Sequence, residues 1–358
     1  MLIPTINNIK KVDIEITNKC NARCPGCIRT VNGDTHPFLQ SNVTEWSLEY
    51  FKSIISKDVV NGKTFILGNT VEDPLMNKNI VSIVEYILEN NGRVKIYTNT
   101  GANTKETFAQ LGKLSSKGTQ HRLIVVFSVD GFENTNHLYR VNVKWNKVVE
   151  NMVAYTNQKG ECEWEYLVFD HNYDDIPLAQ EFAKKLNIPF NLRQNVRNTR
   201  SWFSKTKVKE QGKITTKTFE VKPTTKFEHS ETIKMKELND DYRPMKGSIT
   251  SDKGKTISCK MYHGRSVFVD WSSKVWPCCW FATENFEDHE YYHMLINEFG
   301  ETWNNLKHHS WNEILGHKYY TNLLHESWNG SPSNYYNRTC FKQCGDNAAR
   351  QSYKRQEL

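Results

Sequence analysis

Three cysteines lie close together near the start of the chain, at Cys20, Cys24 and Cys27. Cubane iron–sulfur clusters are normally held by one cysteine thiolate for each iron. Three thiolates leave one iron without a protein ligand, and a small molecule can chelate that iron, as substrate does at the open position of a catalytic zinc. The spacing therefore predicts a [4Fe–4S] cluster with one open iron. A structural zinc site is the alternative, although it needs a fourth ligand, for which His36 is the nearby candidate.

A second set of cysteines lies in the last third of the chain. It consists of Cys259, the adjacent Cys278 and Cys279, and the pair Cys340 and Cys344. Grouped cysteines in a chain of the reducing cytoplasm indicate metal binding or catalysis rather than disulfides. A four-cysteine zinc site is one interpretation of this set, and a second iron–sulfur cluster is the other.

The composition limits the class of protein. The chain has 358 residues, of which 38% are hydrophobic and 24% are charged, with a formal net charge of +7. These values are typical of a globular protein with one large domain and a smaller one. No apolar stretch has the length of a membrane span and the first residues do not resemble a signal peptide, so we expect a cytoplasmic protein without a membrane partner. The lysines are spread along the chain without a nucleic-acid-binding motif, so we expect no nucleic-acid partner.

The first three cysteines must be positioned by the elements around them, which are short β-branched runs alternating with helical patterns. This alternation predicts a parallel sheet with helices outside it. Six units are too few for a closed eight-stranded barrel, so we expect an α/β fold with a partial, TIM-like (β/α)6 barrel over residues 1–200, or else a flat doubly wound sheet. The predicted strands cover residues 12–17, 64–67, 94–98, 123–129, 164–169 and 190–193, and the predicted helices cover residues 46–55 (capped by Thr44), 79–88, 105–114, 145–156 and 174–186.

The remainder of the chain has a different pattern. Residues 201–255 are rich in Lys, Thr and Glu, and we interpret them as a bridging segment, which could be a linker, a β-hairpin insertion or a mobile lid. Residues 256–358 are rich in cysteine and aromatic residues, and this composition predicts a second, small domain.

Polar segments follow successive predicted strands. Residues 68–75 follow the second strand, residues 98–101 the third and residues 128–131 the fourth, with Arg140 shortly after. The carboxyl ends of parallel strands meet at one edge of a barrel, where barrel enzymes form their active sites. Each segment alone is also ordinary turn sequence. As a series beside the cysteine loop, they predict a polar site at that edge.

Together these features resemble the radical S-adenosylmethionine (SAM) superfamily, and within it the SPASM/twitch group, over almost the whole chain. The similar segments are Cys20-Asn21-Ala22-Arg23-Cys24-Pro25-Gly26-Cys27, Gly68-Asn69-Thr70-Val71-Glu72-Asp73-Pro74-Leu75 (a Gly-Gly-Glu-Pro segment in that family), Thr98-Asn99-Thr100-Gly101 (a Thr-Asn-Gly turn), Ser128-Val129-Asp130-Gly131 and Tyr139-Arg140. In the C-terminal part, thirteen residues separate Cys259 from Ser273, which replaces a glycine of the twitch pattern, and four more precede Cys278.

The resemblance implies a reaction and its cofactors. SAM bound at the open iron is cleaved by an electron from an external donor of flavodoxin or ferredoxin type, and the resulting 5′-deoxyadenosyl radical abstracts a hydrogen atom from substrate. Two [4Fe–4S] clusters are implied, the second in a small C-terminal twitch/SPASM-like domain. The implied ligands of the second cluster are Cys259, Cys278, Cys340 and Cys344, with Cys279 as a substitute for Cys278. The implied SAM contacts are Gly68, Glu72, Asp73, Thr98, Asn99, Ser128, Asp130 and Arg140.

Two further candidates come from their positions in the chain. Arg193, with Arg197 and Arg200 after it, lies at the end of the sixth predicted strand, where a guanidinium could hold the SAM carboxylate or an anionic substrate group in a bidentate contact. A solvated basic loop is the alternative. Cys162 precedes the fifth strand and could donate a hydrogen atom to a substrate radical, as a lone cysteine does in some peptide epimerases, but we favour a small half-buried residue.

The substrate is the least determined part of the interpretation. We expect modification of a peptide or protein, and radical dehydrogenation or rearrangement of a small polar alcohol, such as an amino sugar or cyclitol, is the alternative. About ten residues precede the first predicted strand, so a separate partner would supply any peptide-recognition domain. A hypothesis of another class is a non-catalytic metal-binding or electron-transfer protein.

Overall fold

The computed structural model describes residues 4–68, 70–117, 122–194, 201–210, 213–224, 226, 249–250, 256–283, 290–328, 340 and 344. The chain forms two compact units. One comprises residues 14–227, and the other joins residues 1–13 to residues 228–358. We call them the sheet unit and the cysteine-rich unit, and each is described by itself.

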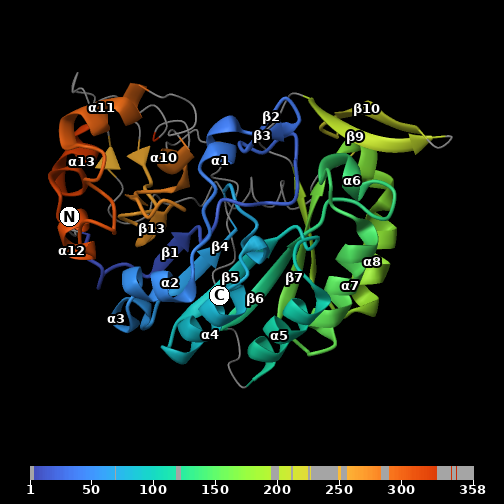
Figure 1. Cartoon of the computed structure of the whole chain (residues 1–358), viewed down its shortest axis with the longest axis horizontal. Helices are drawn as coiled ribbons and strands as arrows, with labels where there is room; N and C mark the ends of the chain where they lie inside the picture. The colour runs from blue at the N-terminus through green and yellow to red at the C-terminus, as the bar shows by residue number, and fades with distance from the viewer. Residues whose placement is uncertain are drawn as a thin grey trace. The chain divides into compact units, whose positions relative to one another are not determined.

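The sheet unit contains the predicted parallel strands. β4 (Thr64–Leu67), β5 (Arg93–Thr98), β6 (Leu123–Ser128), β7 (Cys162–Val168) and β8 (Phe190–Gln194) pair in this order, and every pairing is parallel (Figure 1). β1 (Lys11–Ile14) ends at the first residue of the unit. The α/β class and the mostly parallel sheet are therefore confirmed. The predicted strands begin and end within a few residues of the observed ones.

The two faces of this sheet differ in their cover. Phe65, Phe127 and Trp164 lie on one face, where they pack against aromatic rings of three helices at centroid distances of 6.3, 5.8 and 6.3 Å. These helices are α2 (Leu48–Ile54), α7 (Trp145–Thr156) and α8 (Ile176–Lys185). In β7 every second residue is half-buried. Two of these half-buried residues, Glu163 and Glu165, place charged side chains on the other face of the sheet, and the third is Leu167.

The predicted helices are present, with one correction at a helix start. The remaining long helices are α4 (Ile80–Glu89) and α5 (Lys105–Ser116). Thr44 is not the N-cap of α2, because Ser47 accepts a hydrogen bond from the Tyr50 N–H at 3.1 Å and begins the helix. The short elements that we did not predict are β2 (Thr30–Val31), β3 (Asp34–Thr35), α1 (Pro37–Ser41), α3 (Lys57–Val60), η1 (Pro74–Met76), α6 (Asn136–Tyr139) and η2 (Asp170–Asp175).

The first part of the predicted bridging segment is a β-hairpin of the sheet unit. β9 (Trp202–Glu210) and β10 (Lys213–Val221) pair antiparallel, with Trp202 opposite Val221. The Trp202 indole packs on the cysteine loop so closely that a Cβ at Gly26 would lie 2.7 Å from it. Of the three interpretations of residues 201–255, the described part supports a hairpin. Arg197 and Arg200 lie outside the described residues.

The cysteine-rich unit is built from short elements around buried aromatic residues. Trp276, Tyr319, Tyr320 and Trp328 are fully buried in it. Its strands are β11 (Ile249–Thr250), β12 (Thr256–Ile257), β13 (Ser266–Val269) and β14 (Val275–Trp276); its helices are α10 (Cys279–Thr283), α11 (Glu290–Phe299), α12 (Trp311–Leu315), the π-helical η4 (Tyr319–Leu323) and α13 (Leu324–Glu326).

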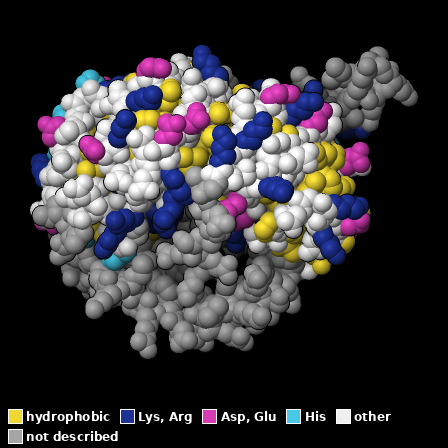
Figure 2. Space-filling view, turned by 90° about the horizontal axis from the view of Figure 1, so that it is seen from below, with side chains coloured by type: hydrophobic (Ala, Val, Ile, Leu, Met, Phe, Trp, Pro, Cys, Tyr) yellow, Lys and Arg dark blue, Asp and Glu magenta, His cyan; other side chains and the backbone are white. Residues whose placement is uncertain are grey.

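The charged side chains of one face can be seen directly. On the face seen in Figure 2, lysine and arginine side chains are scattered among acidic and apolar ones. Within the described part of the chain, every helix is too short or too polar to cross a membrane.

Candidate iron–sulfur and cofactor site

The first cysteine cluster lies on a tightly turned loop of the sheet unit, directly after β1. The Cys27 N–H donates to the Cys24 carbonyl at 3.0 Å, and the Thr30 N–H donates to the Cys27 carbonyl at 2.9 Å. These turns draw the three thiols together from eight residues of sequence. Cys24 is buried, and Cys20 and Cys27 are half-buried.

Two side chains from the carboxyl edge of the sheet contact the cysteine sulfurs. The Asn99 amide nitrogen, directly after β5, lies 3.7 Å from the Cys20 Sγ. The Arg140 guanidinium, directly after α6, lies 3.7 Å from the Cys24 Sγ. Donors aimed at the sulfurs stabilise thiolates and tune a bound cluster. The predicted motifs and the cysteines are therefore brought together.

The electrostatics of the Cys20 and Cys24 thiols fit the binding of cationic iron. Burial raises the pKa of the Cys20 thiol above its usual range, and it raises the pKa of Cys24 to about 11. Proximity adds to both shifts, since the pKa of Cys20 is raised further by Asp73 and Cys24, and that of Cys24 by Cys27. The neighbouring thiols of Cys20 and Cys24 therefore resist ionisation unless cations neutralise them. Iron would supply that charge, so the residues present fit the cluster.

The arrangement differs from a site for one metal ion. Among the described residues, no three His, Cys, Asp or Glu side chains converge as ligands of a single ion. A cubane binds each thiolate at a different iron, so its thiols surround a volume rather than a point.

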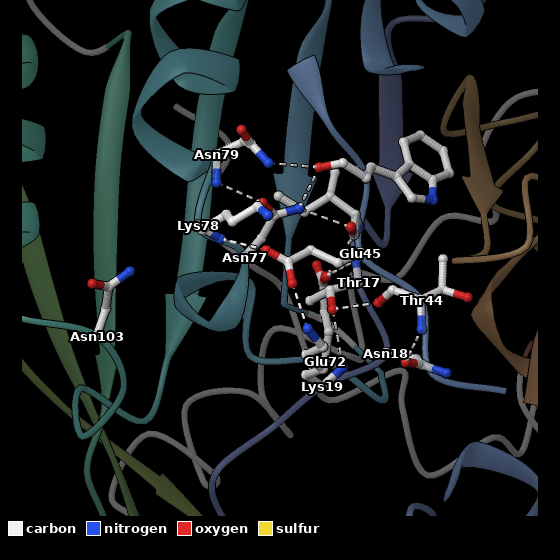
Figure 3. Close-up of polar contacts among 12 residues, drawn as sticks. Thr17, Asn18, Lys19, Thr44, Glu45, Glu72, Asn77, Lys78, Asn79 and Asn103 are labelled. Atoms are coloured by element: carbon white, nitrogen blue, oxygen red, sulfur yellow. Dashed lines mark hydrogen bonds and ion pairs between the residues drawn. The ribbon is translucent and has the colours of Figure 1, made fainter. Parts of the chain in front are cut away.

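Glu72, a predicted SAM contact, is fully engaged with backbone. Its carboxylate accepts a hydrogen bond from the N–H group of Thr17 at 3.0 Å (Figure 3). It also accepts from the N–H groups of Ile16 and Gly68 at 2.9 and 3.1 Å. Burial, and after it the neighbouring Glu15 carboxylate, raises the pKa of Glu72 well above its usual range. Glu72 thus joins the end of β1 to the end of β4.

Gly68 makes this junction possible. Its φ of +90° favours glycine, and a Cβ there would lie 2.1 Å from the Tyr97 carbonyl oxygen. The close approach brings the loop after β4 against β5. Gly68 therefore shapes the edge of the sheet through its backbone.

Asp73 joins the same loop to the next strand. Its carboxylate accepts hydrogen bonds from the Thr98 hydroxyl at 3.0 Å and from the N–H groups of Leu75 and Asn99 at 3.1 and 2.8 Å. Burial raises the pKa of Asp73 from 3.8 to about 6, against the opposing effect of these bonds. Asp73 also fixes the turn that presents the Asn99 amide to Cys20.

Asp130 and Arg140 form an ion pair beside Cys24. The Arg140 Nε lies 2.6 Å from an Asp130 oxygen, and the Leu167 N–H donates to the other oxygen at 2.8 Å. Asp130 is 1% exposed, whereas the Arg140 side chain is 20% exposed. Arg140 can therefore reach both Cys24 and a ligand at the edge.

The remaining candidates of the sheet unit lie at different distances from this edge. Ser128, the last residue of β6, is half-buried. Arg193 pairs with Glu165 at 3.0 Å near the end of β8. Cys162 is the first residue of β7 and lies at the opposite end of the strand from the cysteine loop. Cys162 is buried at that end, and seven residues of strand span roughly 20 Å.

The second set of cysteines converges in the cysteine-rich unit. A small apolar cavity is lined by Cys259, Cys278, Cys340 and Cys344, together with Ile257, Lys260, Pro277, Trp280, Phe281 and Leu324. Burial, and then the other thiols of the set, raises the pKa of Cys278 well above its usual range. Cys279 begins α10 and does not line the cavity. The four implied ligands therefore fit one cluster, and Cys278 fits better than Cys279.

Ser273 occupies the place of the glycine in the twitch pattern. Its φ is +76°, in the left-handed region that glycine favours. Asp270 holds the turn by accepting hydrogen bonds from the N–H groups of Ser272 and Lys274 at 2.9 and 3.0 Å. The backbone thus keeps the glycine conformation without the glycine.

Sequence inspection missed two residues of the site. Arg29 is 5% exposed and lies two residues after Cys27, and its position beside a cysteine motif was the available signal. Asn77 donates to the carbonyls of Ile16 and Trp46 at 2.9 and 3.0 Å and so holds the strand before the cysteines (Figure 3). No sequence signal separates Asn77 from an ordinary turn residue.

The geometry can be compared with known proteins. No model of a protein family and no curated protein sequence matches the chain. Native anSMEcpe with bound AdoMet and Cp18Cys peptide matches with a TM-score of 0.51 at 14% identity, over 98% of this chain and 92% of that chain. Streptococcus suis SuiB bound to S-adenosylmethionine matches with a TM-score of 0.47 at 15% identity, over 76% of this chain, which spans 60% of the SuiB chain. The anSMEcpe match shows, at 14% identity, that the two chains share a fold.

Proposed function

We propose that this protein is a radical SAM enzyme that modifies a peptide or protein. The observation that carries the proposal is the gathering of Cys20, Cys24 and Cys27 at the carboxyl edge of the parallel strands, with donors from Asn99 and Arg140 on two of the sulfurs. When bound, a [4Fe–4S] cluster and SAM supply the electron transfer and the 5′-deoxyadenosyl radical that abstracts a hydrogen atom from substrate.

The chain contributes the ligands and holds them in place. Cys20, Cys24 and Cys27 would bind three irons, and the turns within the loop fix their separation. The Asn99 amide and the Arg140 guanidinium would keep the first two sulfurs anionic. The buried carboxylates of Glu72 and Asp73 hold the flanking strand ends rigid, because their oxygens accept backbone N–H groups from both sides. Rigid supports of this kind keep a reactive group in register with its substrate.

SAM would lie along the same edge, on groups that the chain leaves accessible. Ser128 is half-buried and the Arg140 side chain is 20% exposed, so these two are the candidates for direct contact. Arg193 would contact SAM only by leaving its ion pair with Glu165. Thr98, Glu72, Asp73 and Asp130 are engaged with the protein itself, so we assign them to shaping the edge rather than to direct contact.

The second cluster would lie in the cavity of the cysteine-rich unit. Cys259, Cys278, Cys340 and Cys344 provide one thiolate for each iron, which leaves no open position. The apolar lining would shield it from water, and shielding from solvent is one of the factors that set a cluster potential. This unit would be the twitch-like domain.

The choice of a peptide over a small polar alcohol rests on the anSMEcpe structure, which shares the fold and carries a bound peptide. The open face of the sheet supports a polar substrate in general. Lys95 and Glu163 pair across it at 3.2 Å, with side chains that are 23% and 21% exposed. An external donor of flavodoxin or ferredoxin type would supply the electron.

The test is anaerobic reconstitution of the full chain with iron, sulfide, SAM and a strong reductant. We expect about eight irons per chain, and 5′-deoxyadenosine as a product. Cys24→Ala should abolish 5′-deoxyadenosine formation, whereas the matched control Cys162→Ala should retain it, since Cys162 lies at the far end of β7. A count of about four irons per chain would indicate one cluster and contradict the second. Bound zinc, or clusters without 5′-deoxyadenosine, would indicate a non-catalytic protein and refute the proposal.

A further inference from the structure

Arg29 is a buried cation whose known partners are all uncharged. Its Nη1 donates to the Asn18 carbonyl at 2.9 Å and to the Val71 carbonyl, and its Nε is buried without a hydrogen-bond partner. Within the described residues no carboxylate pairs with it. The nearby Glu72 and Asp73 carboxylates are turned to backbone N–H groups instead.

Such an arrangement is costly unless a negative charge lies close by. Removing a guanidinium from water costs several kcal/mol, and an ion pair or hydrogen bonds must offset that cost. The two carbonyl contacts satisfy some of the N–H donors of the guanidinium, but they do not neutralise its positive charge. The Val71 carbonyl that Arg29 contacts follows Thr70 in the chain, and the Thr70 carbonyl lies 4.0 Å from the Cys27 Sγ.

The missing anion fits the cluster proposed at the neighbouring cysteines. Three thiolates outweigh the charge of an oxidised cubane core, so the assembled group is anionic, and each added electron increases its negative charge. The potential of such a cluster depends on nearby charges and on its exposure to solvent. A buried cation acts strongly on it, because the low dielectric of the interior screens little.

We propose that Arg29 is the counter-charge of the cluster bound by Cys20, Cys24 and Cys27, and that it raises the reduction potential of that cluster. The inference rests on the proposed function, since it requires a cluster at these cysteines. Arg29 is a positioning and tuning residue in this proposal and touches no substrate. The alternative is that Arg29 acts only as a tie between the Asn18 and Val71 carbonyls.

The test is a redox titration of the reconstituted full chain, followed by electron paramagnetic resonance. The signal of this cluster is identified by its change on addition of SAM. Arg29→Gln removes the charge and keeps one donor, and Arg29→Lys keeps the charge and changes the donor geometry. Arg23→Gln is the matched control, because Arg23 lies inside the motif but is 45% exposed and paired with Asp34.

For Arg29→Gln we expect the ratio of reduced to oxidised cluster at a fixed potential to fall at least tenfold, a negative shift of about 59 mV for one electron. Arg29→Lys and Arg23→Gln should stay within about threefold of wild type. If Arg29→Gln loads iron and stays within threefold, Arg29 is a structural tie and the proposal fails.

Iron content separates the remaining outcomes. Loading of Arg29→Lys but not of Arg29→Gln would support the proposal, since charge alone distinguishes them in assembly. Failure of both variants to load would overturn it in favour of the structural tie. Absence of a cluster in wild type would instead refute the proposed function, and the counter-charge with it.

Discussion

Burial of Asp73 makes a specific prediction about stability. Its pKa rises from 3.8 to about 6 in the fold, chiefly because burial disfavours the charged carboxylate. The folded state therefore holds the Asp73 proton more tightly than the unfolded chain. Stability from this group is fully present below pH 3.8, and it is lost as the pH rises through about 6. A difference of about two pKa units corresponds to about 3 kcal/mol. Asp73 is 2% exposed, so solvent screening reduces this little.

Asp73→Asn isolates this contribution, because the amide cannot titrate. We expect the unfolding free energy of the apoprotein, minus that of Asp73→Asn, to fall by about 2.4 kcal/mol between pH 4 and pH 7, since part of the total is already lost at pH 4. Urea denaturation followed by tryptophan fluorescence measures the unfolding free energy of both proteins. The subtraction removes the contribution of the cysteine-rich unit, which both proteins share. Asp34→Asn, at an exposed carboxylate, controls for the loss of a negative charge. A difference that stays flat or rises with pH would refute the reasoning.

Three further predictions concern the sheet unit. Gly26→Ala places a methyl group 2.7 Å from the Trp202 ring and should lower the unfolding free energy by about 1–3 kcal/mol. Adding Trp202→Leu should recover part of that loss, and a double variant whose loss is the sum of the two single losses would contradict the contact. Gly68→Ala meets a backbone carbonyl at φ +90° and should cost more than about 3 kcal/mol, against about 1 kcal/mol for Gly62→Ala, which has φ +71° and open space; equal losses in urea titrations would exclude a steric cause. Burial lowers the pKa of His171 to about 4, so stability should fall by up to about 3 kcal/mol as the pH drops from 6.5 to 4, and His171→Phe should abolish this slope in urea titrations.

The sheet was predictable because its signal is local. β-branched runs such as Thr64–Leu67 are separated by amphipathic helices such as Ile80–Glu89, and that alternation leaves few topologies. The first residue of α2 could not be predicted from the sequence. Ser47 and Thr44 are both good N-cap residues, and which of them caps the helix depends on a distant contact. The Thr44 carbonyl accepts from the Thr17 hydroxyl at 2.7 Å, which holds it outside the helix.

The positions of the candidate site residues were predictable, but their partners were not. The sequence places Glu72 at the right edge of the sheet, yet its hydrogen-bond donors at Ile16 and Thr17 come from more than fifty residues away. Cys278 and Cys279 are adjacent in sequence, and only the spacing from Ser273 favoured Cys278. They differ in the fold, because β14 ends at Trp276 and α10 begins at Cys279, which leaves Cys278 facing the cavity.

The charges around the first cysteine loop act in opposing directions. Asp73 raises the pKa of the Cys20 thiol, and the same charge would favour binding of cationic iron while making a bound cluster harder to reduce. Arg29 and Arg140 act in the opposite sense, on Cys20 and Cys24 respectively. If this balance governs the cluster, Asp73→Asn should raise its potential and Arg29→Gln should lower it. The double variant should then return toward wild type, because the two buried charges remove each other's effect.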